Sequence, residues 1–285
     1  MYRITAREDL APVTKLFKVY APEVARKARA GQFVIVRIDE EGERVPLTIA
    51  DYDRDSGEIT IVFQEVGKTT KQMGLMKVGD EFASFVGPLG LPTDIEKYGT
   101  VLVVGGGVGI APVYPIARAL HEAGNRVIAI IGARNQSLLF WEDKMRSVSD
   151  ELIVCTDDGS YARKALVTEP MKEILSSDKK PDIIWAIGPA IMMKFAALAT
   201  QPFGVKTIVS LNSIMVDGTG MCGACRVEVG GKTKFVCVDG PEFDGHQVDW
   251  QLLLDRQRIY LDQEKRATEL FEQHAHGGCR CGEGK

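Results

Sequence analysis

The sequence predicts a small antiparallel β barrel, then an α/β domain, then a short C-terminal metal-binding segment. The N-terminal part contains short β-branched and aromatic runs separated by turn residues, a pattern typical of small barrels. The middle alternates apolar strands with helices, as in parallel sheets with right-handed crossovers. Three of the six cysteines then fall between residues 222 and 237. We therefore expect domains at residues 1–96, 97–212 and 213–285.

Composition and charge argue against several classes of protein. The chain has 285 residues, which favours about two full domains, and 45% hydrophobic residues, enough for an ordinary core. Its net charge of −4 argues against nucleic-acid binding, and no apolar run approaches the ~20 residues of a membrane span. The N-terminus lacks the apolar segment of a signal peptide. We expect a cytoplasmic protein without nucleic acid or membrane partners, whose clustered cysteines bind metal.

The barrel contains a motif suited to a flat, phosphate-bearing cofactor. Strands are predicted at 33–38 and 59–64, and residues 44–48 lie between them. Arg44 offers a planar fork of donors for a phosphate. Pro46 holds the chain extended, so that backbone groups around Leu47 can face a ring, and Thr48 adds a hydroxyl. The alternative is an edge strand with a surface arginine.

A second candidate motif in the barrel precedes a predicted helix at 71–76. Gly67, Thr69 and Thr70 stand where free N–H groups and the helix dipole favour an anion. The alternative is an ordinary threonine cap. Together on one small barrel, the two motifs resemble the FAD-binding domain of the ferredoxin reductase superfamily.

The α/β domain opens with a strand, a glycine loop and a helix, a turn that cradles phosphates. Its spacing differs from the ordinary dinucleotide fingerprint and resembles the variant of the ferredoxin reductase superfamily. Glycines needed only for packing are the alternative. The proposed NAD(P)-binding residues here are Gly105, Gly106, Gly107, Val108, Gly109, Ala111 and Pro112.

Further candidates follow later strands, because ligands bind beyond the carboxyl ends of parallel strands. Arg134 suits a 2′-phosphate or an adenine ring, so it does not decide between NADP and NAD. Asp157, Asp158 and Gly159 suit ribose hydroxyls, and Gly188–Pro189 open a helix beside the expected nicotinamide. The alternative for Arg134 is a solvated loop arginine, and the alternative for residues 157–159 is a turn with an Asp cap. The predicted strands are 100–104, 127–131, 152–156, 182–187 and 207–210; the helices are 114–123, 138–145, 167–175 and 191–200.

The C-terminal segment has the spacing of an iron–sulfur site. A plant-type two-iron cluster uses Cys-x4-Cys-x2-Cys and a distant Cys. Here Asp217 replaces the first cysteine and is followed by Cys222, Cys225 and Cys237. Residues 226–229 and 234–237 are predicted to form a hairpin that returns Cys237 towards the other ligands. The alternative is zinc, although structural zinc favours paired Cys-x-x-Cys or Cys/His sets.

The end of the chain is predicted as a charged helix at 259–273 followed by a glycine-rich tail. The tail contains His274, His276, Cys279 and Cys281, which could hold a metal. A terminus without fixed structure is the alternative.

Barrel, nucleotide domain and cluster segment, in this order, cover nearly the whole chain and resemble two related families. One comprises electron-transfer subunits of dihydroorotate dehydrogenase. The other comprises small (alpha) subunits of NADH-dependent reduced ferredoxin:NADP oxidoreductase, also described as sulfide dehydrogenase. The two families differ in the cluster ligands that the resemblance implies. Four cysteines are typical of the first family, whereas Asp217 with three cysteines resembles the second. The shared motifs are Arg44–Thr48, Gly105–Pro112, Cys155–Ser160 and Cys237–Pro241.

The resemblance to the second family implies FAD, a [2Fe–2S] cluster and NAD(H), with NADP(H) left open. It implies hydride exchange between NAD(H) and flavin and single-electron passage through the cluster, so no catalytic side chain is expected. It also implies a heterodimer, or a larger assembly, with a large subunit that has a second FAD, two [4Fe–4S] clusters and the NADPH site. Ferredoxin would be reached through this electron-bifurcating complex.

Two other functions stay open. The chain could serve another partner, such as dihydroorotate dehydrogenase or a hydrogenase, or it could be a non-catalytic nucleotide-binding protein with structural zinc. A stand-alone ferredoxin reductase is disfavoured, because Ile187 stands where such reductases usually have a cysteine and their terminal aromatic is missing.

Overall fold

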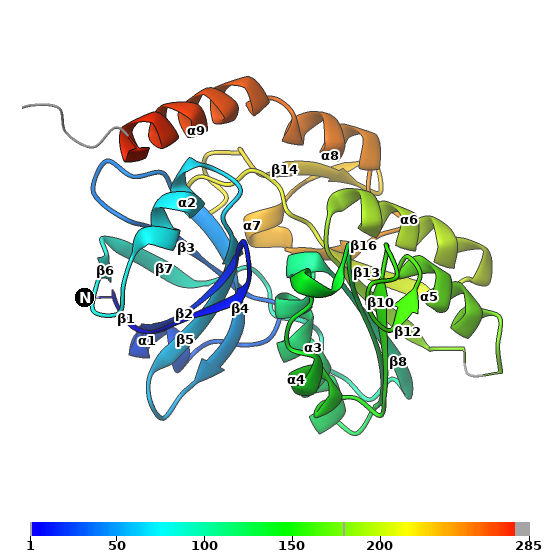
Figure 1. The fold of residues 1–285 in the computed structure, drawn as a ribbon. Coiled ribbons are helices and arrows are strands. Elements are labelled where there is room, and N and C mark those ends of the chain that lie inside the picture. The colour runs from blue at the N-terminus through cyan, green and yellow to red at the C-terminus, as the bar shows by residue number, and fades with distance from the viewer. Residues whose placement is uncertain (1, 179, 277–285) are drawn as a thin grey trace, which may run out of the picture.

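The N-terminal part of the computed structural model is an antiparallel barrel (Figure 1), and the structure describes residues 2–178 and 180–276. Its sheet order is β6-β1-β2-β5-β4-β3-β7. Inward-facing Phe17, Phe63 and Phe85 fill the barrel. The strands are β1 (Tyr2–Ala11), β2 (Thr14–Tyr20), β3 (Phe33–Arg37), β4 (Val45–Asp53), β5 (Glu58–Gln64), β6 (Glu81–Phe82) and β7 (Ser84–Leu89), with helices α1 (Pro22–Ala25) and α2 (Lys68–Leu75).

The second part is a parallel sheet with helices on both faces, as expected from its alternating pattern. Its order is β11-β10-β9-β8-β12-β13-β16, and the edge strand β16 runs antiparallel to its neighbour, β13. The strands are β8 (Thr100–Gly106), β9 (Arg126–Ala133), β10 (Glu151–Thr156), β11 (Arg163–Lys164), β12 (Ile183–Ile187), β13 (Lys206–Ser210) and β16 (Glu242–Asp244). The helices are α3 (Ile110–Glu122), α4 (Glu142–Arg146), α5 (Thr168–Leu175) and α6 (Ala190–Thr200), with 3-10 turns η1 (Gly107–Gly109), η2 (Gln136–Leu138) and η3 (Gln201–Phe203).

Two predicted elements, one in the second part and one in the C-terminal segment, differ from the structure. The helix expected at 138–145 divides into η2 and the short α4, because Trp141 adopts a left-handed backbone conformation (φ 58°) between them. The strand expected at 234–237 ends at Phe235, and Cys237 lies on the short helix α7 (Val236–Asp239).

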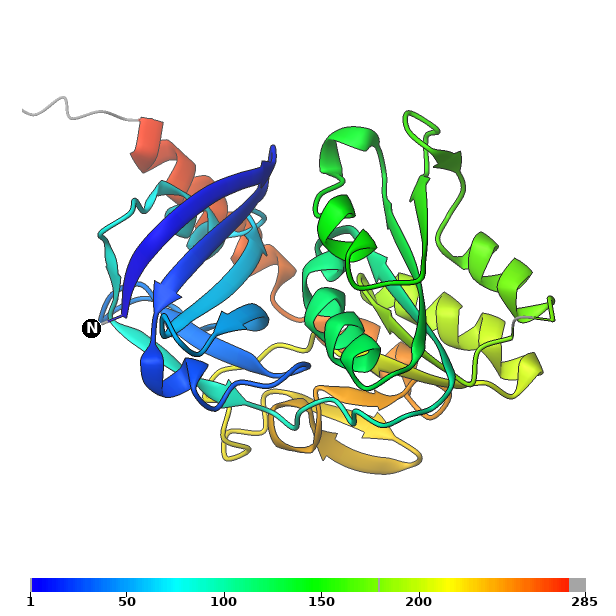
Figure 2. The same ribbon diagram turned by 90° about the horizontal axis from the view of Figure 1, so that it is seen from below.

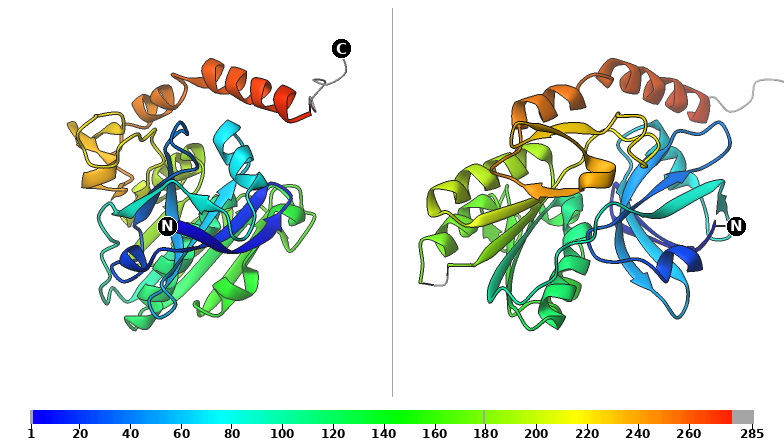
Figure 3. Two further views of the ribbon diagram at one scale, coloured as in Figure 1. Left: turned by 90° about the vertical axis from the view of Figure 1, so that its left-hand side faces the viewer. Right: turned by 180° about the vertical axis from the view of Figure 1, so that it is seen from behind.

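The C-terminal segment joins the other two parts. Strands β14 (Arg226–Val229) and β15 (Lys232–Phe235) form the predicted hairpin, whose Gly230–Gly231 turn has two positive φ angles. Strand β16 then extends the second sheet. Helices α8 (Trp250–Gln257) and α9 (Leu261–His276) follow, and α9 crosses back above the barrel near α2 (Figure 3). Within the described residues, no helix is long and apolar enough to cross a membrane.

Candidate functional site

A cavity of about 530 Å³ lies where the barrel, the second sheet and the C-terminal segment meet; Figure 2 shows the two main parts side by side. It contains ten of the predicted cofactor-binding residues. From the barrel these are Pro46, Leu47, Thr48 and Thr70, and from the second sheet they are Val108, Gly109, Ala111, Pro112, Gly188 and Pro189. Residues more than a hundred positions apart in the sequence therefore line the same cavity.

The position of the cavity follows from the sheet order. Strand β8 lies between β9 and β12, so the chain reverses its winding direction between β8 and β12. The loops that leave the carboxyl ends of such a pair separate and form a crevice, which is where ligands bind to open α/β sheets. Gly109 follows β8 and Gly188 follows β12, so both line the cavity.

The glycine loop after β8 is shaped by close backbone contacts. A Cβ atom on Gly109 would lie 2.2 Å from the carbonyl oxygen of Ile187, and one on Gly106 would lie 2.3 Å from the sulfur of Met192. Gly105 packs on the backbone of Ile110 in the same way. Gly107 differs, because its φ is +56° and nothing lies within 4 Å of the missing side chain. The open space above Gly107 leaves its backbone accessible to a ligand.

The two barrel motifs line the cavity only in part. Thr70 caps α2, since its hydroxyl oxygen accepts hydrogen bonds from the amides of Val66 (3.1 Å) and Gly67 (3.0 Å). The ordinary capping role proposed as an alternative is therefore present, although Thr70 also lines the cavity. Thr69 donates to Glu43, and Arg44 is exposed at the start of β4. Arg44, Gly67 and Thr69 do not line the cavity itself.

A second group of candidate residues lies past the carboxyl ends of the neighbouring strands β9 and β10. It consists of Arg134, which follows β9, and Asp157 and Asp158, which follow β10. The amide of Asp157 donates to Ala133 (3.1 Å), and that of Asp158 donates to the carbonyl of Arg134 (3.2 Å). Asp158 in turn accepts from the amide of Ser160 (2.8 Å), the Asp-capped turn that was the alternative. Burial and the neighbouring Asp158 raise the pKa of Asp157, while the charge of Arg134 partly offsets this rise.

Sequence reasoning missed one wall of the cavity, the stretch that follows β13. Residues 210–213 and Met215 line it, and the Ser213 hydroxyl is buried with no hydrogen-bond partner in the described structure. A buried hydroxyl without a partner is costly, so it marks a place where a bound group would donate or accept. The signal was present in the sequence, because this stretch leaves the carboxyl end of a predicted parallel strand.

The four candidate metal ligands lie in and beside the glycine-rich loop 217–225. The sulfurs of Cys225 and Cys237 are 3.2 Å apart, and the amide of Cys237 points at the sulfur of Cys225 (3.5 Å). Asp217 accepts hydrogen bonds from the amides of Thr219 (2.8 Å) and Cys222 (3.1 Å), which hold its pKa below the usual range. Gly218, Gly220 and Gly223 all have positive φ angles, as a loop wrapped closely around a ligand requires.

These residues form two pairs rather than one compact set. Among the described residues, no group of three or more His, Cys, Asp or Glu side chains could hold a single metal ion. A two-iron cluster takes two protein ligands on each iron, so a two-plus-two arrangement suits it better than it suits tetrahedral zinc. Burial and the Cys225 thiol raise the pKa of Cys237 to about 12. Two adjacent buried thiols of this kind ionise when a metal supplies the compensating charge.

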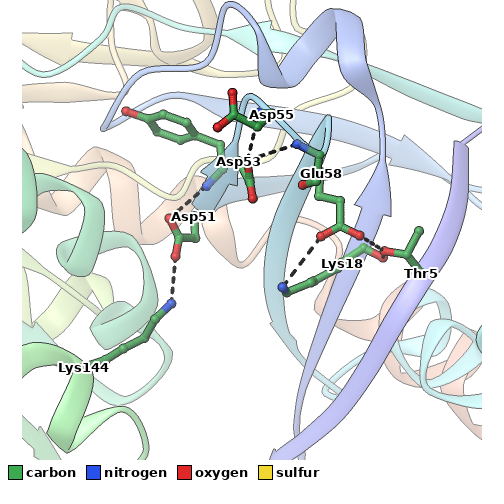
Figure 4. Close-up of polar contacts among 9 residues, drawn as sticks. Thr5, Lys18, Asp51, Asp53, Asp55, Glu58 and Lys144 are labelled. Atoms are coloured by element: carbon green, nitrogen blue, oxygen red, sulfur yellow. Dashed lines mark hydrogen bonds and ion pairs between the residues drawn. The ribbon is translucent and has the colours of Figure 1, made fainter.

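A cluster of charged and aromatic side chains links the barrel to helices α3 and α4 of the second part. Asp51 on β4 accepts from Arg118 on α3 (2.7 Å) and from Lys144 on α4 (2.8 Å), and Figure 4 shows the bond to Lys144. Both cations also lie over the ring of Tyr114, and Lys144 lies over that of Trp141. Burial opposes ionisation of Asp51, but the bonds and charges of the two cations outweigh it and lower its pKa.

Comparison with known protein families matches two parts of the chain. Residues 103–197 match the oxidoreductase NAD-binding domain. Residues 212–249 match the iron–sulfur cluster binding domain of dihydroorotate dehydrogenase B. The second match contains all four candidate metal ligands and begins beside Ser213.

Comparisons with whole proteins cover most of the chain. It is 53% identical to a homolog of the electron transfer subunit of dihydroorotate dehydrogenase B (NAD(+)) from Thermotoga maritima, over 90% of both chains. It is 32% identical to that electron transfer subunit from Desulforamulus reducens, over 87% of this chain and 97% of the relative. Among solved structures, it matches a chain of the NADH-dependent reduced ferredoxin-NADP oxidoreductase, described in work on flavin-based electron bifurcation. That match has a TM-score of 0.91, 50% identity, and coverage of 95% of this chain and 98% of the other.

Proposed function

Because the chain belongs to the family of dihydroorotate dehydrogenase B electron-transfer subunits and their homologues, we propose that it is the small subunit of an electron-bifurcating ferredoxin:NADP oxidoreductase. The comparisons establish the general function: the chain is a subunit of an NAD(P)H-dependent flavoprotein oxidoreductase that uses FAD, a [2Fe–2S] cluster and NAD(H). It works with a larger catalytic partner subunit. The observation that favours bifurcation is Asp217 in the first ligand position, together with the likeness to the oxidoreductase structure.

The cavity supplies what a flavin and a nicotinamide need in order to react. Bound flavin and nicotinamide would supply hydride exchange and single-electron transfer to the cluster. Pro46, Leu47 and Thr48 offer an extended backbone on one wall, and Gly109 and Gly188 let the loops after β8 and β12 pack closely together where they line another wall. The cavity is lined largely by apolar residues, which would help to keep water away from the reacting faces. The buried Ser213 hydroxyl supplies a polar contact on the third wall.

The remaining candidate residues have proposed roles at the ends of the two cofactors. Arg44, Gly67 and Thr69 lie within two residues of residues that line the cavity, and they are proposed to contact the phosphates of FAD. Gly105, Gly106 and Gly107 form the turn that approaches the pyrophosphate of NAD(H). Arg134, Asp157, Asp158 and Gly159 would contact the adenosine ribose. Because two carboxylates face this position against one arginine, we expect NAD(H) to be preferred over NADP(H).

The cluster ligands are proposed as two pairs. Asp217 and Cys222, linked through the Cys222 amide, would hold one iron, and Cys225 and Cys237 the other. Cys222 is exposed while the second pair is buried. The Asp217–Cys222 iron would therefore face the partner, and electrons would leave the subunit on that side.

Bifurcation is tested by asking whether the reduction of ferredoxin depends on the simultaneous reduction of NAD⁺. The complex of this chain with its partner subunit, given NADPH, should reduce ferredoxin only when NAD⁺ is also present. Ferredoxin reduction at full rate without NAD⁺ would contradict the proposal.

A second candidate function is electron transfer for dihydroorotate oxidation, which the matches to dihydroorotate dehydrogenase B subunits favour. Co-purification separates the two. A partner with its own FAD and additional iron–sulfur clusters supports bifurcation, whereas an FMN protein that oxidises dihydroorotate supports the second function.

A further inference from the structure

Glu242 is a carboxylate that none of the proposed roles uses. It lies on β16, and although the residue keeps some exposed surface, its carboxylate is enclosed, which raises its pKa to about 6. Within the described residues no cation pairs with it; its partners are neutral donors. Enclosing a carboxylate without a cation costs free energy, and here the hydrogen bonds from Thr93 and Trp185 offset part of that cost.

Three separate parts of the chain meet at this carboxylate. Thr93, in the linker between the barrel and the second sheet, donates its hydroxyl to one oxygen (2.5 Å). Trp185 on β12 donates its indole N–H to the other (3.1 Å). The barrel backbone at Gly31 fits against both, since a Cβ there would lie 2.3 Å from the Thr93 hydroxyl and 2.8 Å from Glu242.

Each of these contacts is next to a wall of the cofactor cavity. Pro241, which precedes Glu242, lines the cavity. Ile187, two residues after Trp185, lines it from β12, and Phe33, two residues after Gly31, lines it from the barrel. The amide of Thr93 also donates to Ala30 of the barrel (2.9 Å). A shift at Glu242 would therefore move three cavity walls relative to one another: the barrel wall at Phe33, the β12 wall at Ile187 and the C-terminal wall at Pro241.

We infer that Glu242 is a positioning residue that sets the relative placement of the three cavity walls and thereby the rate of hydride transfer between nicotinamide and flavin. This inference rests on the proposed placement of the two rings in the cavity. Because hydride transfer requires reacting atoms in near-contact, small displacements of one wall are expected to have large effects on rate.

The protonation state of Glu242 changes these contacts unequally. The ionised carboxylate accepts from both donors, whereas the acid has a proton that one partner must accept. The Thr93 hydroxyl can turn and accept it, but the Trp185 indole can only donate. The titratable groups that act on Glu242 from the linker are Asp94, which raises its pKa, and Tyr98, whose own pKa burial raises to about 12. A pKa of about 12 keeps Tyr98 protonated from pH 5 to 8, so an ionisation near pH 6 is assigned to Glu242.

Glu242→Gln and Glu242→Leu test the inference in the full-length chain with its flavin and cluster. The amide of E242Q imitates the protonated acid, and the leucine removes both contacts. Stopped-flow reduction of the flavin by NADH, between pH 5 and 8, should show an ionisation near pH 6 in the wild type. E242Q should lack it and keep the low-pH rate throughout, and E242L should be about tenfold slower or more at every pH. Near-ultraviolet circular dichroism should show the same ionisation in the tryptophan bands, which reports on Trp185 without turnover.

Glu96→Gln is the matched control, because it removes an exposed carboxylate from the same linker. It should keep the wild-type rate and pH profile. The inference is overturned if E242Q retains the ionisation and the wild-type rate, or if the loss in E242L is restored by excess FAD. If E242L does not fold, the E242Q profile still decides. A wild-type chain whose flavin NADH cannot reduce would instead overturn the proposed function.

Discussion

Asp217 is the residue that most distinguishes this cluster site. Its carboxylate is a harder ligand than a thiolate, and its oxygens are already fixed by the amides of Thr219 and Cys222. We predict that Asp217→Cys shifts the midpoint potential and the visible absorption of the cluster, because both depend on ligand type. Spectroelectrochemistry measures both. Glu228→Gln, which neutralises an exposed carboxylate on the neighbouring strand, should change neither; an unchanged potential in Asp217→Cys would exclude Asp217 as a ligand.

Gly109 is the glycine whose replacement should be least tolerated. Gly109→Ala would place a Cβ 2.2 Å from the Ile187 carbonyl oxygen, and because the contacts are with the backbone of Ile187 and Gly188, a side-chain movement cannot relieve them. We expect a loss of about 3 kcal/mol or more in unfolding free energy and a loss of NADH affinity. Gly124→Ala is the control, since its positive φ costs about 1 kcal/mol but nothing lies within 4 Å. Urea denaturation and NADH titration would contradict the account if the two variants behaved alike.

Ser213 should contribute to flavin binding. Its buried hydroxyl has no partner among the described residues, so a bound ring or ribityl group can supply one. Removing one such hydrogen bond costs about 1 kcal/mol, which corresponds to roughly fivefold weaker FAD binding in Ser213→Ala. Fluorescence titration of the flavin-free protein measures this. Ser147→Ala, at the exposed end of α4, should bind FAD normally, and equal affinity in both variants would remove Ser213 from the site.

At the scale of elements, β4 and α3 connect cofactor binding to the contact between domains. Strand β4 passes from Thr48 in the cavity to Asp51 three residues on, and α3 passes from Pro112 in the cavity to Arg118. The bonds from Asp51 to Arg118 and Lys144 therefore fix the two elements that line opposite cavity walls. This arrangement limits rotation of one domain against the other.

Asp51→Asn should weaken this contact. We expect a loss of about 2 kcal/mol in unfolding free energy at pH 7, because two charged hydrogen bonds are lost from a largely buried position. The folded-state pKa of Asp51 lies below its ordinary value of 3.8, so its stabilisation is present above that value and is lost as pH falls through the folded pKa. The difference between wild type and variant should therefore shrink on acidification. Urea unfolding at pH 7 and pH 3 measures this; Asp55→Asn, exposed in the adjacent turn, should show no such difference.

For the whole molecule, local motifs were predictable and distant contacts were not. The glycine loop at 105–112 and the turn at Gly230–Gly231 depend on neighbouring residues, so the sequence pattern was enough to place them. Strand β16 was not predicted, because its partner β13 lies more than thirty residues earlier. The pairing of Asp51 with Lys144 and of Glu242 with Thr93 likewise depends on how complete domains pack.

The exact domain boundaries remain proposals, since the C-terminal segment contributes β16 to the second sheet. Cys279 and Cys281 of the tail lie outside the described residues, as do the side chains of His274 and His276.

The central claim is that electrons pass between NAD(H) and the Asp217 cluster through a flavin in the cavity. Anaerobic titration of the purified full-length chain with NADH, followed by absorption and electron paramagnetic resonance spectroscopy, tests it most directly. The account predicts bleaching of one flavin per chain and the appearance of a reduced [2Fe–2S] signal whose spectrum changes in Asp217→Cys. A colourless protein that contains zinc, no iron and no flavin would contradict it.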